Sequence, residues 1–209
     1  MIKVLIADDH KAIRSGVKQI LSDEFGEIEF GEAANAIEVI KKIKEKKWDI
    51  LILDINMPGR NGLEVLKQLK DEEAGLRVLV FSMHPEEQVA IRVLKLGAYG
   101  YLTKDAADTE LTQALRQILS GKKYVTPLIA EKLVSQLENP DNKAPHELLS
   151  DREYQTLLLI AAGKTVSQIA GELSLSVPTV STYRARILEK MSLKTSAELA
   201  NYAIRNNLV

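Results

Sequence analysis

The chain has 209 residues, of which 45% are hydrophobic and 27% charged, and its formal net charge is −1. These values are typical of folded globular proteins and exclude a disordered or collagen-like chain, and the length favours two small domains over one. Because there is no cysteine, the sequence excludes disulfide bonds, thiolate zinc sites and a cysteine nucleophile, and its three histidines are too scattered to predict a metal cluster.

The N-terminal sequence MIKVLIADDH has one lysine, a short apolar run and two acids. This pattern matches neither a signal peptide nor a transit peptide. No apolar run approaches the roughly 20 residues that a membrane-spanning helix needs. We therefore expect a cytoplasmic protein with no membrane partner.

Apolar runs typical of strands alternate with amphipathic runs typical of helices over roughly the first 120 residues. This alternation predicts an α/β domain in which helices cover a parallel sheet. The predicted strands span residues 2–7, 27–33, 49–54, 77–82 and 99–103, and the predicted helices span residues 11–23, 35–47, 62–73, 86–96 and 106–120.

The second predicted helix is rich in lysine, which occupies five of the positions 41–47. Lysine-rich helices can bind nucleic acid, but here Ile37, Ile40 and Ile43 keep an apolar stripe along the helix. We interpret the lysines as a solvated helix face without a function of its own.

Residues 123–146 are predicted to link two domains. Thr126 and Pro127 match a helix N-cap followed by proline at the first helical position. The polar segment 138–146 contains two prolines and no apolar period, so it predicts a domain boundary. The expected division is a first domain over 1–122, a linker with an amphipathic helix over 123–146, and a second domain over 147–209. The apolar residues of the linker helix are Leu128, Ile129, Leu133, Val134 and Leu137.

The second domain is predicted to be small and all-α, with helices over 150–162, 165–173, 177–192 and 196–206. Three of these helices begin at a match to the capping box, in which an N-cap side chain and the side chain three residues later satisfy each other's free backbone donors. The matches are Ser150 with Glu153, Thr165 with Gln168, and Thr195 with Glu198.

Residues 165–191 have the spacing of a helix-turn-helix, with a tight turn at 174–176 and a second helix that would enter the major groove of DNA. Charge supports this less than the spacing does, because residues 145–209 contain 7 Lys or Arg and 6 Asp or Glu. The residues predicted to be buried are Ile169, Leu173, Val177, Val180, Ile187, Leu188 and Met191. Those predicted to face outward or toward DNA are Thr179, Ser181, Thr182, Arg184, Ala185 and Arg186, near Lys190 and Lys194.

Polar residues lie at the ends of four of the predicted strands: Asp8 and Asp9 end the first, Asp54 ends the third, Ser82 ends the fourth, and Lys104 follows the fifth. Open parallel sheets bind ligands at this carboxyl edge. Clustered carboxylates repel one another unless a cation shares the site, and Mg²⁺ prefers oxygen ligands. A carboxylate is also a nucleophile toward phosphorus. The sequence therefore predicts phosphoryl transfer, with Asp54 as nucleophile, Asp8 and Asp9 at the metal, and Ser82 and Lys104 on the phosphoryl oxygens.

The segments VLIADDH, DILILDINMPGRNGLEVL, VLVFS and GAYGYLTKDA resemble the receiver domain of bacterial response regulators. The resemblance covers roughly the first 120 residues. It implies a flavodoxin-like, doubly wound five-stranded parallel sheet in the order 2-1-3-4-5. It also implies that Asp54 is the phosphoacceptor, that Ser82 is the switch hydroxyl and that Tyr101 is the switch aromatic residue.

The same resemblance implies that the backbone carbonyl of Asn56 joins Asp8, Asp9 and Asp54 as a protein ligand of Mg²⁺. The side chains of Asn56 and His84 fall where the family modulates hydrolysis of the phosphoryl group. We do not count these two side chains as catalytic.

The segments LSDREYQTLLLIAAGKTVSQIA and TVSQIAGELSLSVPTVSTYRARILEKM resemble the LuxR/NarL-type, FixJ-like output domain. This resemblance implies a DNA-binding transcriptional regulator that a sensor histidine kinase phosphorylates at Asp54. It further implies double-stranded promoter DNA as a ligand, a homodimer on phosphorylation and RNA polymerase as a further partner. The family often has Lys or Arg where this chain has Ser181, so the base preference is expected to differ. The expected DNA contacts are Thr179, Ser181, Thr182, Arg184, Arg186 and Lys190.

We expect no enzyme activity beyond magnesium-dependent self-phosphorylation and slow self-dephosphorylation at Asp54. Two alternatives stay open. A haloacid-dehalogenase-like phosphatase also uses an aspartate after a strand, but it expects a second aspartate where this chain has Asn56. A receiver that acts through protein contacts alone would use its helical part as a docking module.

Overall fold

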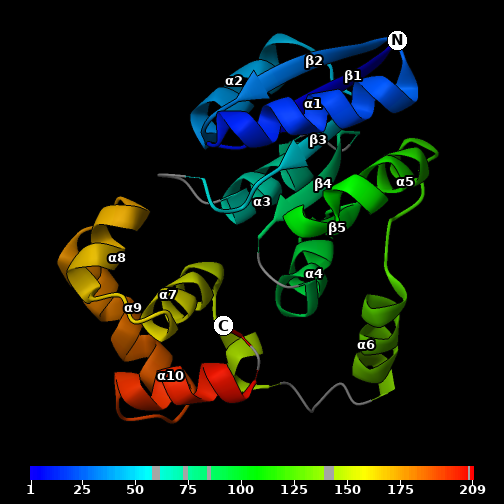
Figure 1. The fold of residues 1–209 in the computed structure, drawn as a ribbon. Coiled ribbons are helices and arrows are strands. Elements are labelled where there is room, and N and C mark those ends of the chain that lie inside the picture. The colour runs from blue at the N-terminus through cyan, green and yellow to red at the C-terminus, as the bar shows by residue number, and fades with distance from the viewer. Residues whose placement is uncertain (58–61, 73–74, 84–85, 139–143, 207) are drawn as a thin grey trace. The chain divides into compact units, whose positions relative to one another are not determined.

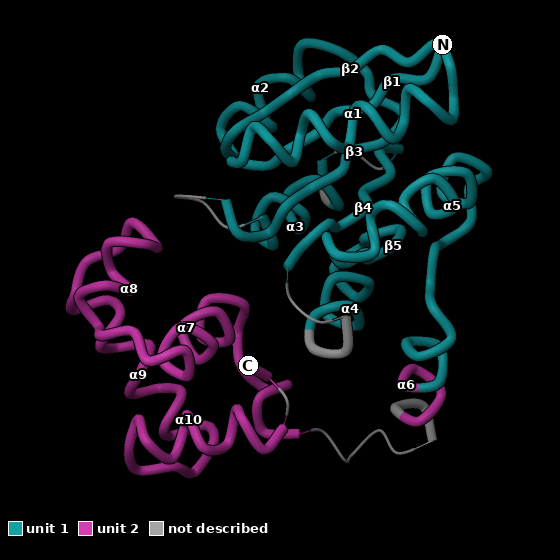
Figure 2. Tube along the Cα trace, in the orientation of Figure 1, with its two compact units in different colours: residues 1–131 teal, residues 132–209 magenta. Residues whose placement is uncertain are grey.

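The computed structural model describes residues 1–57, 62–72, 75–83, 86–138, 144–206 and 208–209 (Figure 1). The chain forms two compact units, residues 1–131 and residues 132–209 (Figure 2). Among the described residues, no helix is long and apolar enough to cross a membrane.

The first unit is built on a five-stranded parallel sheet in the order β2-β1-β3-β4-β5. This confirms the predicted fold class and strand order. The central strand β3 is buried on both faces, as expected where helices cover a parallel sheet. The strands are β1 (Ile2–Ala7), β2 (Ile28–Ala33), β3 (Ile50–Leu53), β4 (Arg77–Ser82) and β5 (Gly100–Thr103).

Helices cover the sheet through alternate strand side chains. Val4, Ile52 and Leu79 belong to one apolar cluster together with Leu21 of α1 and Leu115 of α5, so these two helices share a face. Five α-helices follow the strands in turn, and a 3-10 turn η1 (Lys104–Ala106) precedes the last of them. They are α1 (Lys11–Phe25), α2 (Ala36–Glu45), α3 (Gly62–Glu72), α4 (Glu86–Lys95) and α5 (Ala107–Leu119).

The apolar stripe of α2 begins one residue earlier than the sequence predicts. Ile37 is 79% exposed, whereas Ala36 and Val39 are buried and Ile40 and Ile43 are half-buried. The N-cap is Asn35, whose side chain accepts from the backbone N–H of Glu38. A helix that starts there turns positions 36, 39, 40 and 43 inward, so placing Ile37 in the buried stripe was wrong.

The chain stays on the first unit beyond α5. The backbone N–H of Tyr124 donates to the carbonyl of Tyr99 over 2.7 Å, and Tyr124 forms a parallel bridge with Gly100 of β5. Tyr124 is 7% exposed and belongs to the core cluster. Helix α6 (Pro127–Glu138) follows, with Ile129 buried, as predicted for the linker helix. Its predicted apolar face is only partly covered, because Leu128 and Val134 are exposed.

The second unit is helical throughout its described residues, as predicted. Helix α7 contacts both α9 and α10, and α8 packs on α9. The turn between α8 and α9 passes through Ser174, which adopts the left-handed conformation that usually favours glycine. The elements are η2 (Pro145–Leu148), α7 (Asp151–Ala161), α8 (Val166–Leu173), α9 (Val177–Lys190) and α10 (Ser196–Arg205).

Two of the three predicted capping boxes form, at Ser150 and Thr165. At the third, Thr195 accepts from the backbone N–H of Glu198, but the return bond goes elsewhere. The Glu198 carboxylate accepts from the backbone N–H of Lys194, one residue before the cap, over 2.6 Å. The prediction of a reciprocal box at Thr195 was therefore wrong, although the end of the helix is still capped.

One predicted core residue of the helical unit is exposed. Val177 is 45% exposed at the first position of α9, before that helix packs on its neighbours. Leu188 is half-buried. The other predicted core residues are buried, namely Ile169, Leu173, Val180, Ile187 and Met191.

Candidate functional site

The residues singled out in the first unit lie where adjacent strands end. Asp8 directly follows β1, Asp54 follows β3, Ser82 is the last residue of β4, and Lys104 directly follows β5. Because β1, β3, β4 and β5 are neighbours in a parallel sheet, these ends meet at one edge. Asp8, Asp54 and Ser82 are also buried polar residues in a unit whose other buried side chains are mostly apolar.

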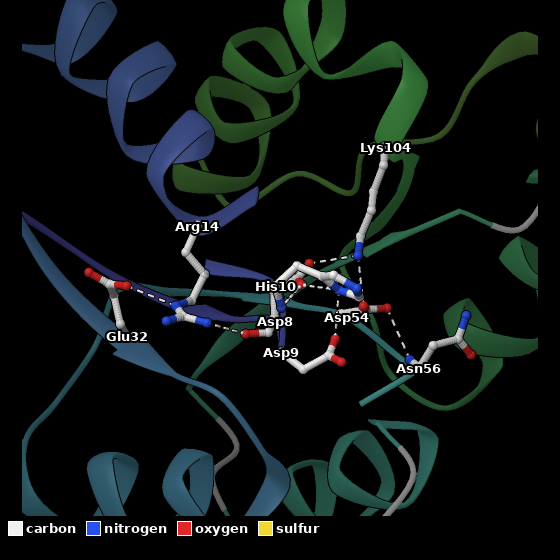
Figure 3. A network of polar contacts seen from close by, with 8 residues as sticks. All are labelled: Asp8, Asp9, His10, Arg14, Glu32, Asp54, Asn56 and Lys104. Carbon is white, nitrogen blue, oxygen red and sulfur yellow. Dashed lines mark hydrogen bonds and ion pairs between the residues drawn. The ribbon is translucent and has the colours of Figure 1, made fainter. Parts of the chain in front are cut away.

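The Lys104 ammonium joins two of the acids (Figure 3). Its Nζ lies 2.6 Å from Asp8 Oδ2 and 2.7 Å from Asp54 Oδ2. All three side chains are almost fully covered, at 6%, 2% and 3% exposure for Lys104, Asp8 and Asp54 respectively. Charges removed from water in this way need a close partner of opposite sign. The structure therefore brings together three of the groups that the sequence assigned to phosphoryl transfer.

Burial raises the pKa of Asp54, because a low-dielectric surrounding disfavours the carboxylate. The hydrogen bond from Lys104 and the backbone N–H of Asn56, which donates to Asp54 Oδ1 over 3.0 Å, lower this pKa and partly offset the burial. Burial by itself lowers the pKa of Lys104, but hydrogen bonds to Asp54 and Asp8 raise it overall. Lys104 therefore remains an ammonium and favours the ionised form of the Asp54 carboxyl.

Asp9 and His10 extend the acidic site toward solvent. The Nδ1 atom of His10 lies 2.9 Å from Asp9 Oδ1 and 3.4 Å from Asp8 Oδ1. Ligand atoms of these three residues all lie within 4.8 Å of one another, a spacing that suits one metal ion. Asp8 and Asp9 were predicted at the metal, but the position of His10 beside them was not.

The donor set fits Mg²⁺. Asp8, Asp9 and Asp54 offer carboxylate oxygens, the ligands that Mg²⁺ prefers, and the single positive charge of Lys104 does not balance three carboxylates. The like charge of Asp8 also raises the pKa of Asp54, a repulsion that a divalent cation would relieve. The backbone of Asn56 is held beside Asp54 by its N–H.

The two expected switch residues lie on the adjacent strands β4 and β5. Ser82 is 0% exposed and pairs with Thr103 across β4 and β5, and Tyr101 is 2% exposed and pairs with Val80. Both side chains are therefore inside the unit, Tyr101 on the strand that leads to Lys104 and Ser82 on the strand beside it. His84 lies outside the described residues.

A second network lies on the other side of the Asp8 backbone (Figure 3). Arg14 of α1 donates from Nη1 to the carbonyl oxygen of Asp8 over 2.7 Å and from Nε to Glu32 Oε2 over 2.8 Å. Lys18 also pairs with Glu32. Hydrogen bonds from Lys18 and Arg14 lower the pKa of Glu32 and keep it ionised. Sequence reasoning missed these residues because they carry no motif, although both bases lie on one face of the first helix.

The expected DNA contacts in α9 fall into two groups. Ser181, Thr182, Arg186 and Lys190 are exposed, whereas Thr179 and Arg184 are half-buried and hold the helix in place. The Nε of Arg184 donates to the hydroxyl of Ser196 at the start of α10 over 2.7 Å. The exposed group presents hydroxyls and cations along the helix, which suits a polyanion.

Lys190 has a structural partner as well. Its ammonium donates over 2.6 Å to Glu153, which is 2% exposed and also closes the cap of α7. Burial by itself raises the pKa of Glu153, but the hydrogen bonds from Lys190 and Ser150 lower it overall. Lys190, an expected DNA contact, therefore also forms an ion pair with a buried carboxylate inside the helical unit.

Two family models match the chain, one in each part. Residues 4–116 match the model of the response regulator receiver domain. Residues 147–203 match the model described as bacterial regulatory proteins, luxR family. The first match contains β2 to β5 in full and all but the first two residues of β1, and the second contains α7, α8 and α9 in full.

Whole-chain relatives give the same result. The chain is 39% identical over 210 residues to the response regulator GacA of Pseudomonas syringae pv. syringae, covering 100% of this chain and 98% of the relative. It is 35% identical over 209 residues to the response regulator UvrY of Escherichia coli, covering 100% and 96%. Among solved structures it resembles RcsB from Salmonella enterica serovar Typhimurium bound to promoter rprA with the phosphomimetic BeF3−, with a TM-score of 0.67, 26% identity and coverage of 97% and 98%.

Proposed function

The chain belongs to the response regulators that join a receiver domain to a LuxR-family DNA-binding domain, and from this premise we propose that phosphorylation of Asp54 controls its binding to promoter DNA. As a member of this family it is a transcriptional regulator under two-component control. The observation that carries the proposal is the buried contact of Lys104 with both Asp8 and Asp54.

Asp54 is the nucleophile. One carboxylate oxygen attacks the phosphorus of a phosphohistidine on a sensor histidine kinase, the N–P bond breaks, and the leaving imidazole takes up a proton. Lys104 keeps Asp54 ionised before the attack and contacts a phosphoryl oxygen afterwards, while the Ser82 hydroxyl donates to another. Asp8, Asp9, Asp54 and the carbonyl of Asn56 would hold Mg²⁺, which supplies positive charge against the phosphoryl oxygens.

The same groups account for limited self-phosphorylation from small phosphodonors and slow self-dephosphorylation, in which water attacks the phosphoryl group and Asp54 leaves as a carboxylate. The family assignment leaves no support for a haloacid-dehalogenase-like phosphatase, which would also need an acid at Asn56. Phosphorylation thus serves as a signal, and it is not one step of a metabolic reaction.

The switch is a shift in population between two arrangements of the first unit. The dianionic phosphoryl group attracts Ser82 and Lys104, and Tyr101 repacks because its strand runs directly into Lys104. We propose that the surface around β5 and its flanking helices then forms a homodimer. Two DNA-binding domains joined in this way gain affinity for paired half-sites.

The DNA reader is α9, inserted into the major groove of double-stranded promoter DNA. Thr179, Ser181, Thr182, Arg184, Arg186 and Lys190 are the proposed contacts. The relative RcsB has been solved bound to promoter DNA, which supports this use of the matching helical part. Because Ser181 is short and neutral, we expect base discrimination to depend more on Thr182 and Arg186.

The proposed domain division is 1–122 for the receiver, 123–146 for the linker and 147–209 for the DNA-binding domain. The sensor kinase and promoter DNA are the proposed partners, with RNA polymerase as a further contact on the promoter. These partners place the protein in the cytoplasm.

The first test is labelling with acetyl phosphate and Mg²⁺, followed by intact mass spectrometry. The wild-type chain is expected to gain one phosphoryl group, and Asp54→Asn none. Undiminished labelling of Asp54→Asn would contradict the assignment of the phosphoacceptor.

The second test is selection of genomic DNA fragments with the phosphorylated and unphosphorylated chain. Phosphorylation should raise both the dimer fraction and the affinity for selected fragments. Arg186→Ala should weaken binding by roughly tenfold or more, whereas Arg205→Ala, at the exposed end of α10, should not. Partner binding without specific DNA binding would favour the alternative in which the helical part is a docking module.

A further inference from the structure

We propose that Arg14 is a positioning residue for the metal site: it fixes the turn that carries Asp8 and Asp9, and Glu32 holds it in place. This inference rests on the proposed function, in which those two acids hold Mg²⁺. Arg14 acts through the backbone of Asp8 and is not itself a ligand.

Arg14 is built into the fold and is not a mobile surface cation. It lies in the first turn of α1, where its backbone N–H donates to the carbonyl of His10 over 3.3 Å. Its side chain is only 13% exposed. The guanidinium is planar and presents N–H groups in fixed directions, so it can contact the Asp8 carbonyl and the Glu32 carboxylate at the same time.

Strand β2 therefore holds the backbone of Asp8 in two ways, directly through Ala33 and indirectly through Glu32 and Arg14. The N–H of Asp8 donates to the carbonyl of Ala33 over 3.1 Å, directly through the backbone. Its carbonyl accepts from Arg14, which is anchored to Glu32, the residue before Ala33. Because the backbone N–H and the backbone carbonyl of Asp8 are both engaged, rotation of the backbone at Asp8 is restricted.

The orientation of this peptide matters because two adjacent acids must converge. Asp8 Oδ1 accepts from the backbone N–H of His10 over 2.8 Å, and Oδ2 contacts Lys104. These two contacts fix the orientation of the Asp8 carboxylate. Two adjacent carboxylates repel each other, and a loose turn would let them move apart. Groups that orient metal ligands through hydrogen bonds commonly change metal affinity by about 10- to 100-fold when they are lost.

Lys18 gives a matched control. It pairs with the same Glu32 carboxylate as Arg14, from one helical turn further along α1. No contact between Lys18 and the Asp8 peptide is present among the described residues. Arg14→Met and Lys18→Met each remove one cation from Glu32, but only Arg14→Met releases the Asp8 carbonyl.

The experiment measures the Mg²⁺ dissociation constant of the full-length, unphosphorylated chain by isothermal titration calorimetry, with the melting temperature of each variant as a check on folding. We expect Arg14→Met to weaken Mg²⁺ binding by about tenfold, at the lower end of the usual range, and Lys18→Met by less than about twofold. Arg14→Lys, which keeps the charge but loses the fixed geometry, should recover only part of the affinity.

A second readout separates positioning from general damage. With acetyl phosphate as donor, the Mg²⁺ concentration for half-maximal phosphorylation of Arg14→Met should rise in the same proportion, while the rate at saturating Mg²⁺ returns toward wild type. If Arg14→Met does not fold, Glu32→Gln can replace it. This variant keeps the side-chain shape but weakens the contact that holds Arg14, so it should raise the same half-maximal Mg²⁺ concentration.

Equal Mg²⁺ affinity in the Arg14→Met and Lys18→Met variants would overturn the inference and leave the proposed function intact. A wild-type chain that binds no Mg²⁺ would overturn both the inference and the proposed metal site. A lower saturating rate with an unchanged half-maximal Mg²⁺ concentration would also overturn it, because this would place Arg14 in a different role.

Discussion

The carboxylate of Glu153 accepts a hydrogen bond from Lys190 over 2.6 Å, which joins the first turn of α7 to the last turn of α9. The same Glu153 oxygen accepts the backbone N–H of Ser150 over 2.8 Å and so closes the capping box. One buried acid thus caps one helix and fixes the end of the proposed DNA-reading helix. Losing it would leave two donors without their acceptor.

This contact predicts an acid-sensitive helical unit. The pKa of Glu153 is lower in the folded chain than its ordinary value of 4.5. The contact therefore stabilises the fold fully above that value and loses its effect as the pH falls through the lowered folded pKa. Glu153→Gln should lower the free energy of opening of α7 and α9 at pH 7, and the difference from wild type should vanish under strongly acidic conditions. Hydrogen exchange of the α7 and α9 amides measures it.

Lys164→Met is the control for this prediction, because Lys164 pairs with Glu172 on the surface, where both side chains are substantially exposed. Its effect should be within about 1 kcal/mol and nearly independent of acidification. A Glu153→Gln difference that persisted unchanged at low pH would show that the ionised carboxylate is not what stabilises the unit.

Lys104→Met should raise the pKa of Asp54 in metal-free protein. Burial and the like charge of Asp8 both raise this pKa, and the hydrogen bond from Lys104 is the largest influence that lowers it. Titration of the Asp54 carboxyl carbon by NMR would detect the change. Asn56→Ala retains the backbone N–H that contacts Asp54 and should cause a much smaller change. A lower pKa in Lys104→Met would refute this account.

Gly62→Ala should destabilise the first unit by about 1–3 kcal/mol, because there is no room for a side chain. A Cβ atom there would lie 2.6 Å from both the carbonyl oxygen of Asp54 and the Cα of Ile55. Gly16→Ala in α1 is the control: nothing lies within 4 Å, and alanine favours a helix by about 0.5–1 kcal/mol over glycine. Urea unfolding followed by fluorescence of Trp48, the only tryptophan in the chain, reports on this unit. Equal midpoints for the two variants would contradict the close approach.

Tyr124→Ala should cost the first unit about 3 kcal/mol or more, as expected for loss of a buried aromatic ring. Tyr124→Phe should cost only about 1 kcal/mol, because it keeps the ring and loses the hydrogen bond from its hydroxyl to Glu110 over 2.5 Å. The same Trp48 unfolding curves measure both. A Tyr124→Ala variant as stable as wild type would mean that the segment after α5 does not stabilise the sheet.

The sequence predicts the elements well because their signals are local. All five strands were placed within one residue at each end, since apolar runs between polar turns have sharp limits. Ile37 was misplaced because its apolar side chain suggests burial. The helix begins at its N-cap Asn35, and this start turns Ile37 toward solvent. Ser174 is similar, because a left-handed residue that is not glycine leaves no sign in the sequence.

In the candidate site, too, some residues could be predicted from the sequence and others could not. Asp54, Asp8 and Lys104 could be predicted together because parallel strands end at one edge, and the topology then brings their side chains into contact. Arg14 and Glu32 could not, since their pairing depends on side-chain directions between α1 and β2. The partnership of Lys190 with Glu153 was hidden for the same reason, across 37 residues of sequence.

The bridge between Gly100 and Tyr124 also bears on self-association. Strand β5 is the last strand of the sheet, and such an edge presents free backbone donors and acceptors that another molecule can pair with. Tyr124 covers part of that edge through its bridge to Gly100. A receiver cut after residue 122 would lose this cover, whereas one that continues to residue 131 would keep it. The first residues of the segment that joins the two units thus leave less of the β5 edge open to pairing with a second molecule.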